Sequence, residues 1–454
     1  MIIQFSVSNF LSFDSKETFS MMAGKARKNI DRIFNNKKIK LTKCEVLFGA
    51  NASGKSNLVS AFQFVQRMIV DGLPRGFSNK YFRLDSTKKS IPTEFEIKFL
   101  CNSKIFVYSF SIILSTGSIL KEYLYEEQSS VSTKFLFCRD TKAETFCVGN
   151  YFKKSSTIAK LNNYGEDSSN DQEALFLSII NKNKGKMFTD LPELQILRDI
   201  FEWFADKLTI SFPDTILTGY PYFTDTNLGE IADLLNALGT GISNLKIVKV
   251  PEEVIKNKIP SDLYNRIIAD LEKANAHIAP DENERPKIMA RSYKEFYTFE
   301  IDANGNITIT TIEFSHENKQ IFFDLNEESD GTARLLDLIE ILFRISDNRI
   351  FIIDEIDRCL HPSMTVKVIE LFLKMAKIRN TQLIITSHES RLLASEMLRN
   401  DEICFVSKTT QGASVINPLE KYQLRADKKV YAALFDGTLD IGPSFDQSKL
   451  SRLL

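Results

Sequence analysis

The sequence predicts an α/β protein with a mostly parallel sheet, an antiparallel β-subdomain and a helical insertion. Two observations carry this prediction. Apolar strand-like runs alternate with helix-like segments in the last third of the chain, and several strand-like runs follow one another between residues 93 and 137. Of the 454 residues, 43% are hydrophobic and 26% are charged, which excludes a disordered chain.

The first lobe is expected to span residues 1–150. Apolar and polar residues alternate from Ile3 to Val7, which predicts a strand with one buried face. An apolar strand at 45–48 leads into a glycine-rich loop and then into a helix with an apolar stripe from Leu58 to Met68. The runs at 93–137 are expected to form an antiparallel sheet beside that strand.

Residues 151–295 are expected to form a compact helical insertion, because apolar residues recur there at helical spacing. None of its helices sustains heptads over several turns, so a long coiled-coil arm is not expected. The third part, 296–454, returns to strands at 296–325. It then alternates a helix at 331–345, a strand at 349–355, a helix at 363–377, a strand at 382–388 and a helix at 389–398.

The loop at 49–56, GANASGKS, fits the phosphate-loop pattern Gly-x-x-x-x-Gly-Lys-Ser, and it lies between a buried strand and a helix. Gly49 and Gly54 let backbone N–H groups surround phosphates, and the helix N-terminus adds positive potential. Lys55 is expected to reach the β- and γ-phosphates and Ser56 to bind Mg²⁺. The remaining nucleotide-binding candidates in and after the loop are Asn51, Ser53 and Asn57.

An apolar strand at 350–353 ends in Asp354 and Glu355. Carboxylates at the end of a buried strand are costly unless they serve a cation or a water. We therefore expect Asp354 to bind Mg²⁺ and Glu355 to polarise the attacking water. His388 follows another apolar strand and would face the same sheet end. The alternatives are a strand that simply ends in charged residues and a histidine without a role.

Ser329 and Gly331 lie in a short turn before the helix that precedes the acid-bearing strand, and such a turn at a helix N-terminus can bind an anion. Taken alone, the turn is better explained as a capped helix start. Its place shortly before Asp354 favours the anion site.

These motifs, in this order, resemble those of ABC-type P-loop ATPase heads, whose wider branch includes the SMC, RecF and OLD proteins. Within that branch, the chain more closely resembles the AAA-like, ABC-fold ATPases of bacterial anti-phage systems, such as the RloA/AbiL type and the AriA ATPase of PARIS. The resemblance covers roughly 1–140 and 295–440. The signature turn departs from the pattern, since ESDGT stands at 328–332 where LSGGQ is usual, so only Ser329 and Gly331 carry over.

The resemblance implies that two heads enclose ATP and Mg²⁺ between them. Lys55, Ser56, Asp354, Glu355 and His388 would come from one subunit. Ser329 and Gly331 would come from its partner, with Asp357 across the seam. The implied assembly is a homodimer through the ATP sites, or a larger homo-oligomer such as a hexamer.

The resemblance also implies the leading function, an ATPase sensor or scaffold in anti-phage defence that controls a separate, Toprim-like nuclease and responds to a phage protein. The sequence after His388 is expected to be too short for a nuclease domain of its own. The alternative is a DNA repair or recombination ATPase of the RecF or SMC type that binds duplex DNA. A transporter subunit is disfavoured, because the interval from Lys55 to Ser329 is too long.

Charge and cysteines give further expectations. The net charge is −1, which disfavours a protein that coats nucleic acid, but residues 25–43 hold eight Lys or Arg and one acid. That segment is either a solvated loop or a site for phosphates or an acidic partner.

The six cysteines form no CxxC motif, and neither a signal peptide nor a membrane span is evident, so we expect a cytoplasmic protein with reduced thiols.

Overall fold

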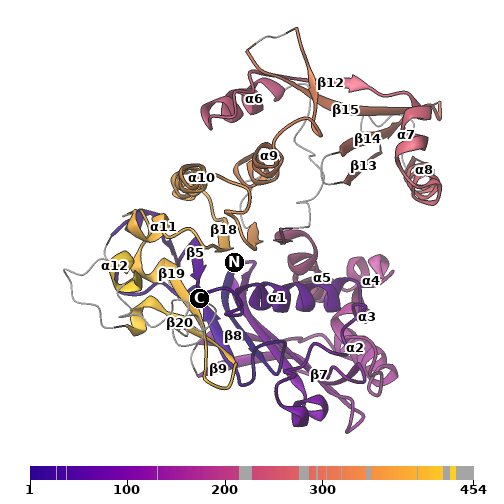
Figure 1. Ribbon diagram of the computed structural model, residues 1–454. Coiled ribbons are helices and arrows are strands. Elements are labelled where there is room, and N and C mark those ends of the chain that lie inside the picture. The colour runs from indigo at the N-terminus through magenta and orange to yellow at the C-terminus, as the bar shows by residue number, and fades with distance from the viewer. Residues whose placement is uncertain are drawn as a thin grey trace. The chain divides into compact units, whose positions relative to one another are not determined.

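The computed structural model describes the whole chain except residues 27, 37, 130, 214–226, 276–285, 293–294, 303, 318–319, 344–348, 396, 423–429 and 436–454. The chain forms two compact units (Figure 1). Unit 1 comprises Met1–Ser211, Ile345–Ile356 and Phe372–Leu454. Unit 2 comprises Phe212–Arg344 and Asp357–Leu371.

A six-stranded sheet in unit 1 has the order β11-β17-β18-β5-β19-β20. Every neighbouring pair is parallel except β19 with β20, which is antiparallel. The strands are β11 (Leu208–Ser211), β17 (Ile350–Ile353), β18 (Gln382–Thr386), β5 (Cys44–Phe48), β19 (Ile403–Lys408) and β20 (Ser414–Pro418). All residues of β5, β17 and β18 are buried, which explains the apolar runs at 46–48, 350–353 and 383–385.

A second sheet in unit 1 has seven antiparallel strands in the order β10-β9-β8-β7-β6-β1-β2. They are β10 (Thr145–Val148), β9 (Ser132–Asp140), β8 (Ser118–Ser129), β7 (Lys104–Ile113), β6 (Thr93–Cys101), β1 (Ile2–Ser8) and β2 (Glu17–Ser20). A short hairpin of β3 (Phe34–Asn35) and β4 (Lys40–Leu41) follows β2. The predicted antiparallel subdomain beside a mostly parallel sheet is therefore confirmed.

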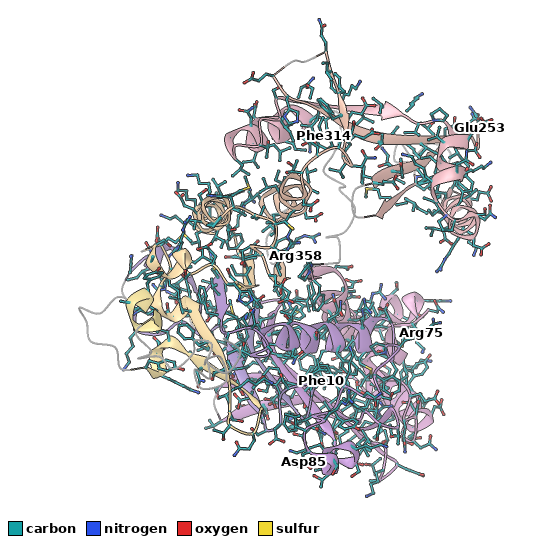
Figure 2. The ribbon with its side chains drawn as sticks, in the orientation of Figure 1. Phe10, Arg75, Asp85, Glu253, Phe314 and Arg358 are labelled. Atoms are coloured by element: carbon teal, nitrogen blue, oxygen red, sulfur yellow. The ribbon has the colours of Figure 1, made fainter. Side chains whose placement is uncertain are left out.

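Helix α1 (Lys55–Val70) lies against both sheets of unit 1. Phe62 of α1 stacks on Phe5 of β1 with ring centroids 3.9 Å apart, and Phe64 stacks on Phe95 of β6 at 5.3 Å. Phe10, in the loop after β1, joins this aromatic core and is labelled in Figure 2. The core therefore holds the start of α1, and with it the glycine-rich loop, in a fixed position.

The other helices of unit 1 surround these sheets. They are α2 (Ser155–Asp167), α3 (Phe176–Asn181), α4 (Gly185–Asp190), α5 (Gln195–Glu202), α11 (Arg391–Ala394) and α12 (Val430–Phe435). Helix α10 (Pro362–Met375) begins in unit 2 and ends in unit 1. The helix predicted at 389–398 is reduced to the four residues of α11.

Unit 2 contains its own sheet, in the order β12-β15-β14-β13, with β16 also paired to β15. The strands are β12 (Asn244–Lys249), β13 (Lys287–Ser292), β14 (Glu295–Ile301), β15 (Ile307–Ser315) and β16 (Phe323–Asp324). Its helices are α6 (Leu228–Ala237), α7 (Glu252–Lys258), α8 (Ser261–Asn275) and α9 (Asp330–Phe343). Apolar residues of α7 and α8 pack on β14 and β15 around Phe299.

The structure corrects the predicted helical insertion at 151–295. Residues 151–211 belong to unit 1 and the rest to unit 2, so the segment is not one compact domain. It also contains strands β11, β12 and β13. Strands β11 and β12 were missed because they form only with partners distant in sequence, β17 and β15 respectively, whereas β13 pairs with the adjacent β14.

Candidate functional site

Three parallel strands bring polar residues to one edge of the six-stranded sheet. Strand β5 leads into the loop at 49–54, β17 into Asp354 and Glu355, and β18 into Ser387 and His388. The register pairs Leu47 with Thr386 and Ile353 with Ile385, so all three strands end at nearly the same level. The carboxyl edge of a parallel sheet is where such folds bind ligands.

The two glycines of the loop stand where no side chain fits. A Cβ atom on Gly54 would lie 2.1 Å from the Ser414 Oγ, and the φ of Gly54 is +112°, a conformation that favours glycine. A Cβ atom on Gly49 would lie 2.2 Å from the Val406 carbonyl oxygen. Glycine at these two positions therefore lets the backbone of the loop lie close to β19 and β20.

Two polar side chains of the loop fit a phosphate ligand. The buried Lys55 Nζ donates to the carbonyl oxygens of Gly49 and Ala50 at 2.8 and 3.1 Å, so its charge lies within the curl of the loop. The Ser53 Oγ is buried and has no hydrogen-bond partner, which is costly for a hydroxyl. A cation and an unsatisfied hydroxyl beside bare backbone make a site suited to phosphate oxygens.

Two serines that were not predicted from the sequence, Ser12 and Ser414, connect the loop to the segment after β1 by hydrogen bonds. The Ser414 Oγ lies 2.6 Å from the Ser53 carbonyl oxygen and 2.7 Å from the Ser12 Oγ. The Asn57 Nδ2 donates to the same Ser12 Oγ at 2.7 Å. Asn57, predicted to contact nucleotide, therefore positions the first turn of α1 against the loop after β1.

Thr386 links the two predicted acids. Its Oγ1 donates to the Asp354 Oδ1 at 2.6 Å and accepts the Glu355 backbone N–H at 2.7 Å. Both Thr386 and Asp354 are buried, whereas Glu355 is half-buried and has a φ of 47°. The hydrogen bond to Thr386 holds the backbone of Glu355 in this unfavourable conformation, and so fixes the position of its Cα and Cβ atoms. The only sequence signal for Thr386 was its place at the end of an apolar run before Ser387 and His388.

The other predicted residues of unit 1 lie at the surface of this edge. Asn51 is exposed in the loop, Ser56 is exposed in the first turn of α1, and His388 is exposed after β18. Among the residues described, no cluster of three or more His, Cys, Asp or Glu could hold a metal ion. Mg²⁺ commonly takes only one or two protein ligands and completes its shell with phosphates and water, so Ser56 and Asp354 suffice as candidates.

Ser329, Gly331 and Asp357 belong to unit 2. Ser329 precedes α9, and its Oγ accepts the Thr332 N–H at 3.0 Å, so it caps the helix. A Cβ atom on Gly331 would lie 2.9 Å from the Cys359 carbonyl oxygen, which places the turn against the residues after Asp357. Ser329 itself is exposed. The structure thus places these three residues in one unit, with the turn at Gly331 close to Cys359, two residues after Asp357.

The basic segment 25–43 is only partly a solvated loop. Arg32 is buried and donates to the Met397 carbonyl oxygen and to Glu402, while the buried Lys43 donates to the carbonyl oxygens of Ala376 and Arg379. The exposed members are Lys25, Lys28, Lys38 and Lys40. Arg27 and Lys37 lie outside the described residues.

A cluster of buried carboxyl groups lies where this segment meets β5 and β19. Burial raises the pKa of Glu402 to about 7, although nearby Arg32 lowers it. Burial and then the charge of Glu402 raise the pKa of Glu45 well above its usual range. One carboxyl oxygen of each residue is buried without a hydrogen-bond partner. The cluster therefore favours protonated carboxyl groups inside the fold.

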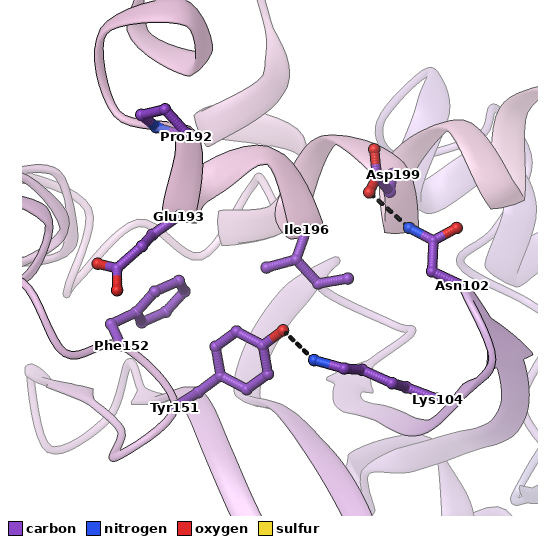
Figure 3. Close-up of a pocket in the computed structure, with 8 residues that line it drawn as sticks. All are labelled: Asn102, Lys104, Tyr151, Phe152, Pro192, Glu193, Ile196 and Asp199. Carbon is purple, nitrogen blue, oxygen red and sulfur yellow. Dashed lines mark hydrogen bonds between the residues drawn. The ribbon is translucent and has the colours of Figure 1, made fainter.

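A separate pocket of about 330 Å³ opens in unit 1 (Figure 3). Its polar groups satisfy one another: the Lys104 Nζ donates to the Tyr151 hydroxyl at 3.0 Å, and the Asn102 Nδ2 donates to Asp199 at 2.6 Å. None of the residues that line it belongs to the loop at 49–56 or to the acid pair. The size of this pocket and the residues that line it do not connect it with the candidate site at the edge of the six-stranded sheet.

A family model described as "AAA domain, putative AbiEii toxin, Type IV TA system" matches residues 46–148 and 228–394, more than half of the chain. No curated protein matches. Among the described residues, no helix is long and apolar enough to cross a membrane.

Solved structures similar to the chain include three SMC heads. An Smc head bound to the C-winged helix domain of ScpA is 14% identical with a TM-score of 0.41, and the match covers 93% of this chain and 99% of that one. The SMC head domain of Thermotoga maritima is 12% identical with a TM-score of 0.32, covering 92% and 98%. A Pyrococcus furiosus Smc head with an extended coiled coil, bound to the C-terminal domain of ScpA, is 14% identical with a TM-score of 0.36, covering 92% and 97%.

Proposed function

We propose, from the premise that this chain belongs to the AAA-domain family of AbiEii type, that it binds and hydrolyses ATP as the sensor or scaffold subunit of an anti-phage defence system. The observation that carries the ATPase part is the convergence of β5, β17 and β18 on one sheet edge. That edge presents a phosphate loop, a buried acid and a half-buried acid within one unit.

The phosphate loop would hold the triphosphate of ATP. The backbone N–H groups of 49–54 and the N-terminus of α1 supply partial positive charge, and Lys55 supplies a full one. Lys55 now donates to the loop's own carbonyl oxygens. Phosphate oxygens would exchange for those acceptors, and the Ser53 hydroxyl would gain a partner for an atom that is now buried without one.

Ser56 and Asp354 would hold Mg²⁺, which when bound neutralises charge on the phosphates. The Asp354 carboxylate is kept in place by the Thr386 hydroxyl at 2.6 Å. Glu355, the next residue, would accept the proton of the attacking water, and His388 would donate a hydrogen bond to the γ-phosphate. Thr386 anchors the backbone of Glu355 at the same time, so one hydroxyl sets the positions of both acids.

We further propose that two copies of the chain complete the site. Ser329, Gly331 and Asp357 lie on exposed or half-exposed parts of unit 2, at the N-terminus of α9 and in the turn after β17. A helix N-terminus with small residues suits the γ-phosphate of a nucleotide held by another subunit. ATP binding would then favour the dimer, and hydrolysis would release it. A hexamer is the larger assembly that the same contact would allow.

The role in defence rests on the family description, which names a toxin of a type IV toxin–antitoxin system. Among the described residues, no group of three or more His, Cys, Asp or Glu side chains could hold a metal ion, so this part of the chain gives no support to a metal-dependent nuclease site. We therefore propose that a separate, Toprim-like nuclease cleaves nucleic acid. The ATP-dependent assembly of this chain would control that nuclease, and a phage protein would alter the assembly.

Two variants test the proposal. Lys55→Ala should lose ATP binding, whereas Glu355→Gln should bind ATP, fail to turn it over and accumulate as a dimer. General bases typically contribute about 10²–10⁴-fold to rate. Normal turnover in both variants would remove the ATPase assignment.

The defence role requires a different measurement. The chain should co-purify with the product of a neighbouring gene, and the Glu355→Gln variant should hold that partner more firmly in ATP than without it. Salt-dependent binding to bare duplex DNA, with no protein partner, would instead support the repair or recombination alternative.

A further inference from the structure

Two cysteines of unit 1 face each other across the last strand pair of the antiparallel sheet. Strands β9 and β10 pair in a register that sets Cys138 directly opposite Cys147. Directly opposed residues of antiparallel strands have Cβ atoms about 4.5–5.5 Å apart and project from the same face of the sheet. Burial raises the pKa of Cys138, and the neighbouring Cys147 thiol raises it further.

This pair differs from the other cysteines in access. Cys147 is exposed and Cys138 is half-buried. Cys44, Cys101 and Cys404 are buried, so an oxidant in solution does not reach their thiols. Cys359 is exposed but belongs to unit 2. An oxidant in solution therefore meets one cysteine that has a second thiol within reach.

The backbone geometry allows a bond between the two sulfur atoms but strains it. The Gly149 N–H donates to the Leu136 carbonyl oxygen at 2.9 Å, and by the alternation of antiparallel pairs Cys147 and Cys138 form a hydrogen-bonded pair as well. Such pairs have Cα atoms about 5.5 Å apart, which a disulfide spans, but its Cβ atoms must approach to about 3.8 Å. A disulfide that draws its strands together is more easily reduced than a relaxed one.

We propose that Cys138 and Cys147 are a reversible redox site. The two cysteines form an intramolecular disulfide when they are oxidised by a low-molecular-weight disulfide such as oxidised glutathione. The Cys147 thiolate attacks one sulfur of the oxidant, the S–S bond of the oxidant breaks, and its first half leaves as a thiol. The Cys138 thiolate then attacks the mixed disulfide at the Cys147 sulfur and releases the second half. Two protein thiols lose two electrons, and one glutathione disulfide becomes two glutathione thiols.

The bond would hold the edge of the sheet against α2. Strand β10 has only four residues and is the terminal strand of the sheet. Its Phe146 ring lies 4.5 Å from that of Phe176 and 6.0 Å from that of Phe137, and a Cβ atom on Gly165 of α2 would meet the same ring. A crosslink between β9 and β10 would therefore restrict the opening of the edge on which α2 packs.

The test uses the full-length protein, reduced, freed of reductant and equilibrated in glutathione buffers of increasing oxidised fraction. After the remaining thiols are alkylated, intact mass and peptide mapping identify the products. We expect a species that has lost the mass of two hydrogen atoms, with a linked peptide joining Cys138 to Cys147. Reductant should restore the starting mass. Hydrogen exchange of 132–148 should be slower in the oxidised protein.

Three serine variants complete the test. Cys147→Ser and Cys138→Ser should abolish the linked peptide, while the matched control Cys359→Ser, which removes an exposed cysteine elsewhere, should keep it. The proposal is overturned if the wild-type protein stays reduced in the most oxidising buffer. It is equally overturned if Cys138 and Cys147 end only as separate glutathione adducts, or if the control variant loses the link.

Discussion

Replacing Thr386 with valine tests whether one buried hydroxyl positions both acids of the candidate site. Valine keeps nearly the same shape and removes only the oxygen that bonds to the Asp354 Oδ1 at 2.6 Å and to the Glu355 N–H at 2.7 Å. Thr386 is completely buried, so water cannot take over either bond without a rearrangement of the sheet end. The change therefore acts on the site through position and not through direct contact with the substrate.

The magnitude follows from the two lost bonds. A hydrogen bond to a charged acceptor contributes about 1.5–3 kcal/mol and one to a backbone N–H about 1 kcal/mol, so the free energy of unfolding should fall by roughly 2–4 kcal/mol. Groups that orient a metal ligand typically change metal affinity or activity by about 10–100-fold. We expect a loss of ATP turnover in that range, together with a higher Mg²⁺ concentration for half-maximal rate.

Urea unfolding and ATP turnover across a Mg²⁺ series measure the two effects. Thr386→Ser is the matched control, because it keeps the hydroxyl and loses only a methyl group, and it should retain most of the turnover and the wild-type Mg²⁺ dependence. If the valine variant unfolds and turns over ATP as the serine variant does, with the same Mg²⁺ dependence, the hydroxyl does not position the acids and the reasoning fails.

Three further changes have defined outcomes. Gly54→Ala forces a Cβ into a φ of +112° beside Ser414, so it should cost about 1–3 kcal/mol of stability and weaken ATP binding. The control is Gly229→Ala, whose added Cβ has no heavy atom within 4 Å, and it should change neither stability nor ATP binding. Because the pKa of Glu402 is raised from 4.5 to about 7, its folded form keeps a proton that the unfolded form releases, and wild-type stability should fall as pH rises through that window. Glu402→Gln should flatten this slope by up to about 3 kcal/mol in urea unfolding across the window, and an unchanged slope would contradict the assignment. Ser329→Arg should bind ATP but not hydrolyse it, and mixing it with Lys55→Ala should restore part of the activity through one intact composite site. No restoration in mixed dimers would exclude a site shared between subunits.

Much of the fold was predictable because its signals are local. The runs at 46–48, 350–353 and 383–385 are apolar throughout, which is typical of strands covered on both faces, and they form the central parts of β5, β17 and β18. Helical spacing located α9 and α10 to within two residues of their observed ends. Sequence patterns did not locate β11 and β12, whose pairing partners are distant in the sequence. Strand β12, with the sequence Asn-Leu-Lys-Ile-Val-Lys, was not predicted, yet it pairs along its full length with β15.

The sequence by itself determined which chemistry the chain could carry: the phosphate-loop pattern, the two acids after an apolar strand and the later histidine are readable without a fold. Tertiary structure decided how those groups are held. Thr386 joins the acids only because β18 lies beside β17, and Ser12 reaches Ser414 across 402 residues because β20 ends the sheet next to the loop. A hydroxyl gives no periodic signal along the chain. Its partner is set by sheet order and register, which arise only when distant strands meet.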